Sequence, residues 1–162
     1  REGEFTLASG RTSKWYLDAR QVTYRGDCLE TVGRAVLEAV DGLAFDAVGG
    51  LTLGADPVAL AVAACSGKRA FAVRKEAKGH GRGSWVEGAR LGPRDRVVMV
   101  EDVVSTGASL LRAAERVQEL GAVVVAASAL LDRSPVVAER FAGAGIPWMP
   151  LLTWADLGIE PL

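Results

Sequence analysis

Short, continuous apolar runs alternate along this chain with longer stretches in which apolar residues recur every three or four positions. The short runs predict buried strands, at 45–48, 70–73, 97–100, 123–131 and 146–152. The periodic stretches predict helices, at 28–40 after an N-cap at Asp27, at 57–65, around 110–120 ending at Gly121, and at 135–142. Strands that alternate with helices favour an α/β fold with a mostly parallel central sheet flanked by helices.

Two segments lack this periodicity. Residues 5–24 mix aromatic and β-branched residues with a turn cluster at 9–13, which predicts a small irregular hairpin before the main body. Residues 74–84 are charged and rich in glycine, which predicts a mobile loop. Because no repeat or long linker divides the sequence, we expect a single domain over residues 1–162.

Composition restricts the classes of partner. The 162 residues are 49% hydrophobic, which is enough to bury a core, and the net charge of -1 provides no global attraction to nucleic acid or anionic membranes. Any anion site must therefore be local. The longest mostly apolar run, 122–131, is shorter than the roughly 20 residues of a membrane-spanning helix.

The two cysteines and the start of the chain bear on compartment. Cys28 and Cys65 predict neither a disulfide framework nor a zinc site, so a reducing cytoplasm is the expected compartment. The sequence opens on Arg1 without a methionine or an apolar signal region. We therefore expect a trimmed N-terminus rather than a secreted precursor.

The stretch 97–109 contains the most informative chemistry. Glu101 and Asp102 follow a predicted buried strand, at the end where open parallel sheets bind their ligands. Small residues follow at an expected helix start, where free amides and the helix dipole suit a phosphate: Ser105, Thr106, Gly107 and Ser109. The pattern predicts one ligand with hydroxyls, phosphate and a divalent metal. Taken alone, it also fits solvated acids before an ordinary helix cap. Neither a Gly-Lys-Ser/Thr phosphate loop nor a Gly-x-Gly-x-x-Gly after a strand is present.

A second cluster of charge lies in the predicted mobile loop. Arg74, Lys75, Lys78 and Arg82 are opposed only by Glu76, a local charge of about +3, and the single histidine, His80, lies among them. Intervening glycines would let the segment close over a site as a lid. Such cations, with a histidine able to donate a hydrogen bond, suit a group that carries several negative charges. By itself, the cluster also fits an ordinary solvated loop.

These residues resemble a known family. An apolar strand, an acidic pair, two apolar residues and Ser-Thr-Gly-x-Ser resemble the phosphoribosyl pyrophosphate (PRPP) signature of type I phosphoribosyltransferases. Segment 74–81, followed by Val-Glu-Gly at 86–88, is similar to the catalytic loop of orotate phosphoribosyltransferases. Three other segments resemble parts of that family in order: 5–18 the orotate-covering segment, 49–57 the pyrophosphate loop, and 131–133 the strand end whose arginine pairs with orotate.

The resemblance implies the type I phosphoribosyltransferase fold with a small N-terminal hood over residues 1–25, the transfer of phosphoribose from PRPP to orotate, Mg²⁺ as cofactor, and a homodimer with shared active sites. It implies Lys78 as the main catalytic cation, aided by His80, with Arg74 and Lys75 on pyrophosphate; Arg74 and Lys78 would act in the partner's site. Ser105 and Arg133 would hold orotate, as a planar guanidinium suits a carboxylate. The implied PRPP contacts are Glu101, Asp102, Val103, Val104, Ser105, Thr106, Gly107, Ala108 and Ser109, with Mg²⁺ held through PRPP near the two acids.

The sequence departs from the family at two positions. Ala8 and Leu53 stand where many members carry lysine, which removes two cations near the pyrophosphate or the ring. Trp148 and Trp154 are expected to pack rather than bind. Two alternatives stay open. An enzyme of the same fold acting on a purine would need a base pocket other than Ser105 and Arg133, and a PRPP-sensing regulator would need a DNA-binding domain or basic face that the sequence lacks.

Overall fold

The computed structural model describes residues 2–6, 12–76 and 85–162, so Ala8, Lys78 and His80 lie outside the described residues. Six strands form the central sheet in the order β5-β4-β3-β6-β7-β8. Their bounds are β3 (Ala47–Leu51), β4 (Arg69–Val73), β5 (Val86–Gly88), β6 (Arg96–Val104), β7 (Val123–Asp132) and β8 (Leu152–Thr153). All neighbours pair in parallel except β4 and β5.

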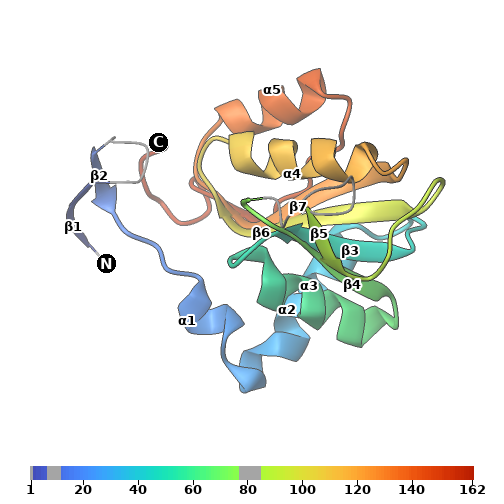
Figure 1. The fold of residues 1–162 in the computed structure, drawn as a ribbon. Coiled ribbons are helices and arrows are strands. Elements are labelled where there is room, and N and C mark those ends of the chain that lie inside the picture. Colours follow the sequence, from blue (N-terminus) through green and yellow to red (C-terminus); the bar gives the residue numbers. More distant parts are fainter. Residues whose placement is uncertain (1, 7–11, 77–84) are drawn as a thin grey trace.

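Helices cover both faces of this sheet (Figure 1). One face carries α2 (Gly26–Ala39) and α3 (Ala55–Ser66), and the other carries α4 (Ala108–Gln118) and α5 (Val136–Gly143). Val97 and Met99 of β6 pack in the core under α4, while Val98 and Val100 pack in the core under α2 and α3. Successive strand residues point to opposite faces of the sheet. Because helices cover both faces, each of these four side chains is fully buried. The predicted α/β fold with a mostly parallel, doubly covered sheet is confirmed.

The N-terminal segment lies apart from this sheet and beside the C-terminal tail (Figure 1). Strands β1 (Glu2–Thr6) and β2 (Thr12–Trp15) form an antiparallel hairpin, as the sequence predicted, and a short helix α1 (Arg20–Thr23) connects it to α2. Lys14 Nζ lies 3.6 Å from a carboxylate oxygen of Glu160, across the two ends of the chain. This exposed ion pair adds a contact between the hairpin and the segment that follows the last strand.

Three local predictions were wrong. Helix α2 begins at Gly26 with Arg25 at its N-cap, and Asp27 lies in its first turn, paired with the Arg25 guanidinium. The predicted strand 146–152 reduces to β8 and an isolated bridge at Trp148, although Met149 N and Leu151 N still donate to carbonyls of β7. Strand β6 continues to Val104, so the two acids lie within the strand rather than after it. No helix in the described ranges is both long and apolar enough to span a bilayer.

Candidate active site

The carboxyl end of β6 positions the acidic pair in the middle of the sheet edge. Strand β6 lies between β3 and β7, and it passes through Glu101 and Asp102 before the chain bends at 105–107 into α4. This is the edge at which parallel sheets bind ligands. A cavity of about 190 Å³ opens there, lined by Glu101, Val103, Val104, Ser105, Thr106, Gly107, Ser109 and Leu110. The structure thus brings most of the predicted PRPP residues to one hollow.

The loop before α4 presents free backbone donors to this hollow. Among the described residues, none accepts a hydrogen bond from the amides of 106–110, and the first helical bond runs from Leu111 N to Gly107 O at 2.9 Å. Gly107 adopts a φ of 74°, which a residue with a side chain rarely adopts. Arg140 of α5 donates to the Thr106 carbonyl and holds the loop from outside. The arrangement suits a phosphate at the start of a helix.

Burial sets the charge state of Glu101. Burial, and after it the neighbouring Asp102 carboxylate, raise the pKa of Glu101 to about 9. Asp102 N donates to Glu101 Oε1 at 3.2 Å, and Val103 N donates to Asp102 Oδ1 at 2.7 Å. Glu101 is therefore neutral at pH 7 when no cation or hydroxyl ligand is near.

The segment between β3 and α3 packs directly on these acids. A Cβ at Gly54 would lie 2.5 Å from Asp102 Oδ1 and 2.5 Å from Glu101 Oε1, so only glycine fits without moving a carboxylate. The Thr52–Leu53 peptide before it is cis, a feature that the sequence did not predict. Asp56 follows, with a buried Oδ1 that has no hydrogen-bond partner in the described part of the chain and a pKa raised by burial. The predicted pyrophosphate loop and the acids thus form one side of the site.

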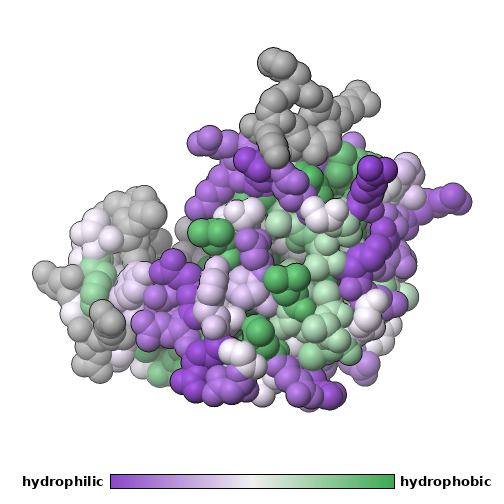
Figure 2. Space-filling view, turned by 60° about the horizontal axis from the view of Figure 1, so that its bottom comes forward, coloured by the Kyte–Doolittle hydropathy of each residue, from purple (hydrophilic) through white to green (hydrophobic). Residues whose placement is uncertain are grey.

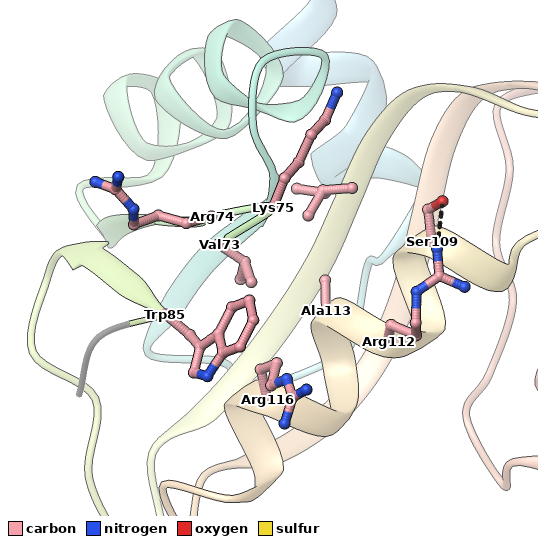
Figure 3. Close-up of a pocket in the computed structure, with 9 residues that line it drawn as sticks. Val73, Arg74, Lys75, Trp85, Ser109, Arg112, Ala113 and Arg116 are labelled. Carbon is pink, nitrogen blue, oxygen red and sulfur yellow. Dashed lines mark hydrogen bonds between the residues drawn. The ribbon is translucent and has the colours of Figure 1, made fainter. Parts of the chain in front are cut away.

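Two of the predicted pyrophosphate cations, Arg74 and Lys75, directly follow the end of β4. Arg74 Nη1 lies 3.1 Å from Glu87 Oε1, and its Nε donates to the Glu76 carbonyl. Arg74 and Lys75 also line a cavity of about 300 Å³ against α4 (Figure 3). Lys78 and His80 lie outside the described residues, so their roles stay predictions.

Strand pairing places Ser105 and Arg133 together. The register of β6 and β7 pairs Val104 with Asp132, so the next residue of each strand leaves the sheet at the same level. Arg133 N donates to the Val104 carbonyl at 2.8 Å. These are the two residues to which the family resemblance assigned orotate.

The Arg133 side chain connects β7 to the N-terminal hairpin. Arg133 as a whole is 3% exposed, and its guanidinium donates from Nη2 to Ser13 Oγ at 3.0 Å and to the Trp15 carbonyl at 3.3 Å. Burial lowers the pKa of Arg133. Its Nε is buried without a hydrogen-bond partner among the described residues, so one strong donor is left for a ligand.

Asp132 holds the backbone that carries Arg133, a role that sequence reasoning missed. Its Oδ1 accepts from Ser134 N at 2.9 Å and its Oδ2 accepts from Trp148 Nε1 at 2.9 Å. Trp148 stacks on Phe141 with ring centroids 4.7 Å apart, so it packs as expected. A carboxylate directly after the predicted strand 123–131 and three residues before Pro135 was the available signal.

No model of a known protein family matches the chain. Orotate phosphoribosyltransferases from Rhodopirellula baltica and Streptomyces avermitilis are 44% and 45% identical to it, over 98% of this chain and 88% and 90% of theirs. The crystal structure of Mycobacterium tuberculosis orotate phosphoribosyltransferase in complex with PRPP aligns with a TM-score of 0.82 at 37% identity, covering 96% of this chain and 90% of that one. An adenine phosphoribosyltransferase from Leishmania donovani, 19% identical with a TM-score of 0.70, shares the fold alone. The chain belongs to the orotate phosphoribosyltransferase family.

Proposed function

We propose that the chain transfers the phosphoribosyl group of PRPP to N1 of orotate, giving orotidine 5′-monophosphate and pyrophosphate in de novo pyrimidine synthesis. One observation carries the proposal within this family. The β6 and β7 register sets the phosphate-binding loop beside Arg133, so a phosphate and a carboxylate find their donors at one sheet edge. Orotate is a planar base with a carboxylate, and PRPP carries a ribose phosphate. The two substrates together therefore present one anionic group to each set of donors.

The loop before α4 holds the 5′-phosphate of PRPP. The unpaired amides of 106–110 donate to its oxygens, and the helix dipole adds a favourable field. Glu101 and Asp102 accept hydrogen bonds from the ribose hydroxyls, with Val103 and Val104 fixing their backbone. As the bond to pyrophosphate lengthens, positive charge develops at C1′ and these acids stabilise it.

Arg133 and the Ser105 hydroxyl hold orotate. The guanidinium already lies fixed between Ser13 and Trp15, so little side-chain entropy is lost when it binds. Its unpartnered Nε donates to the orotate carboxylate, which removes the cost of a buried, unsatisfied donor. The segment 1–25 serves as a hood over this base.

The acidic pair fits Mg²⁺ bound together with its substrate. In the described part of the chain no three His, Cys, Asp or Glu residues form a metal cluster, whereas Mg²⁺ commonly uses one or two carboxylates plus substrate phosphates. Glu101 and Asp102 would hold the ion, directly or through PRPP. When bound, Mg²⁺ neutralises charge on the leaving pyrophosphate.

Lys78, aided by His80, is the main catalytic cation of the proposal, and Arg74 and Lys75 bind pyrophosphate. The chain works as a single domain in which 74–84 is a mobile loop, and it forms a homodimer in which Arg74 and Lys78 serve the partner's site. Apolar side chains support a dimer: they gather over α3 (Figure 2), and Leu60 there is 61% exposed. The compartment is the cytoplasm, where the free Cys28 and Cys65 stay reduced.

A Lys78→Ala variant tests the mechanism. We expect its kcat for orotidine 5′-monophosphate formation to fall by about 100-fold or more, while the Kd for Mg²⁺–PRPP changes by less than about threefold, because the cation acts mainly on charge that develops in the transition state. Lys68→Ala, which removes a lysine just before β4, is the matched control and should keep full activity. An unchanged kcat in Lys78→Ala would remove that residue from the mechanism.

A further inference from the structure

A cavity between α4 and the ends of the loop after β4 lies next to the phosphate-binding loop but is distinct from it. Its volume is about 300 Å³, and its lining includes Lys75, Trp85, Arg112 and Arg116 (Figure 3). It shares Ser109 with the hollow at the acidic pair. Arg112 and Arg116 had no place in the family resemblance, and the reaction proposed above does not use them.

The cavity is positively charged. None of its nine lining residues is acidic, and four carry a positive charge: Arg74, Lys75, Arg112 and Arg116. Arg74 pairs with Glu87 and Arg116 with Glu119. Within the described ranges Arg112 bonds only the Ser109 hydroxyl, at 3.2 Å, and Lys75 has no ion pair. Two cations are therefore available to an anion.

The floor of the cavity is apolar and aromatic. Leu51, Val73 and Ala113 form it, and the Trp85 ring closes one end with the Arg116 guanidinium 4.4 Å from its centroid. Figure 3 shows Arg112 and Ser109 toward the other end, on the first turns of α4. Small-molecule sites are commonly mostly apolar, with a few placed polar groups, and begin at about this volume.

We propose that this cavity binds a phosphorylated aromatic small molecule of the size of a nucleoside monophosphate. Its phosphate lies on Arg112 and Lys75, because a guanidinium fork matches phosphate oxygens in a bidentate way. Its ring lies on the apolar floor toward Trp85. Arg112 and Trp85 take no part in the phosphoribosyl transfer proposed above, whereas the lining residues Arg74, Lys75 and Ser109 were assigned to it. A molecule bound there would therefore act as an effector that also occupies a pyrophosphate contact, rather than as a substrate.

Adenosine 5′-monophosphate is a suitable probe, because it is neither substrate nor product of the proposed reaction. Binding to the full chain is followed by the NMR signal of the Trp85 indole N–H, identified by its loss in Trp85→Phe. We expect a saturable shift of this signal. Arg112→Gln should weaken the affinity by about 10- to 100-fold, the effect of losing charge-assisted hydrogen bonds.

Arg34→Gln is the matched control, because Arg34 is an exposed helical arginine on the opposite face of the sheet, paired with Glu30. It should leave the affinity unchanged, and Arg116→Gln should weaken it. Inorganic phosphate alone should bind at least about tenfold more weakly than the nucleotide if the apolar floor contributes. No shift at Trp85 up to about 10 mM nucleotide, or equal affinity in Arg112→Gln and the parent chain, would overturn the site. Equal affinity for phosphate and nucleotide would overturn the aromatic ligand.

Discussion

The two halves of the proposed active site are built in different ways. The phosphate half, 101–109, is one continuous stretch whose shape follows from a strand, a bend and a helix start. The orotate half joins Arg133 to Ser13, which lies 120 residues away in the sequence, through a hydrogen bond of 3.0 Å. The first half depends on local backbone, whereas the second depends on the hairpin and the C-terminal tail docking correctly. Substitutions in the second half should therefore weaken the binding of orotate and leave the binding of PRPP unchanged.

The largest expected effect comes from Arg133. We expect Arg133→Leu to lower kcat/KM for orotate by about 100-fold or more, because the Nε donor to the orotate carboxylate is lost together with the Nη2 bonds that hold the hairpin, while the KM for PRPP changes by less than about threefold. Arg133→Lys keeps the charge but loses the planar guanidinium, so its kcat/KM for orotate should still be lower by about tenfold or more. Steady-state kinetics with both substrates varied measures the split. An equal loss toward both substrates would contradict the division into halves.

In the phosphate half, the largest effect is a pH dependence. The folded state holds the Glu101 proton up to a pKa of about 9, well above the unfolded value, so the ligand-free fold binds more protons than the unfolded chain between those values. This stabilisation is complete at low pH and is lost as pH rises toward 9, with a slope of at most about 1.4 kcal/mol per pH unit. Urea unfolding from about pH 5 to pH 9 should show this slope. Glu101→Gln should flatten it, and an unchanged slope in that variant would refute the assignment.

Gly54→Ala tests the packing on the acids. The added Cβ would fall 2.5 Å from the ends of both carboxylates, which are flexible side chains and can move aside. We expect activity to fall by about tenfold while the free energy of unfolding changes by less than about 0.5 kcal/mol. Gly26→Ala, with nothing within 4 Å of the added Cβ, is the control for both readouts. A large loss of stability with normal activity per folded molecule would place Gly54 in the structural core instead.

The smallest expected effect comes from the hairpin. Ser13→Ala removes the hydroxyl that accepts from Arg133 and should cost about 1 kcal/mol, raising the KM for orotate about fivefold. The KM for PRPP should not move, since Ser13 lies on β2 and contacts the orotate half only. If PRPP binding weakens as much as orotate binding, the hairpin supports both halves equally.

The same division explains what the sequence could predict. Local patterns identified β6, Glu101, Asp102 and the loop before α4, because each depends on neighbours in the chain. Strand β5 was not predicted, because three residues are too few to show an alternation of apolar and polar positions. Its pairing with β4 is set by the tertiary fold. The strand predicted at 146–152 is longer than the observed β8 because an apolar run indicates burial and not which backbone groups pair in a ladder.

Contacts between distant residues needed the structure. The sequence suggested Arg133 for orotate only through a family resemblance, and nothing local linked it to Ser13 or linked Asp132 to Trp148. Arg112 and Arg116 were visible as arginines one helical turn apart, but their cavity forms only when α4 packs beside β4 and Trp85. The chemistry of a site could be predicted where its residues are neighbours in the sequence. Which distant residue contacts which could not be predicted.

The central claim is that the phosphate-binding loop at 105–109 and Arg133 form one site for PRPP and orotate. The most direct measurement is an initial-rate assay of the purified chain with PRPP, Mg²⁺ and, in turn, orotate, uracil, hypoxanthine and xanthine. We expect phosphoribosyl transfer to orotate, with kcat/KM at least about 100-fold higher than for any base lacking the carboxylate, since Arg133 would otherwise stay unsatisfied. No transfer to orotate, or faster transfer to a purine, would contradict the account.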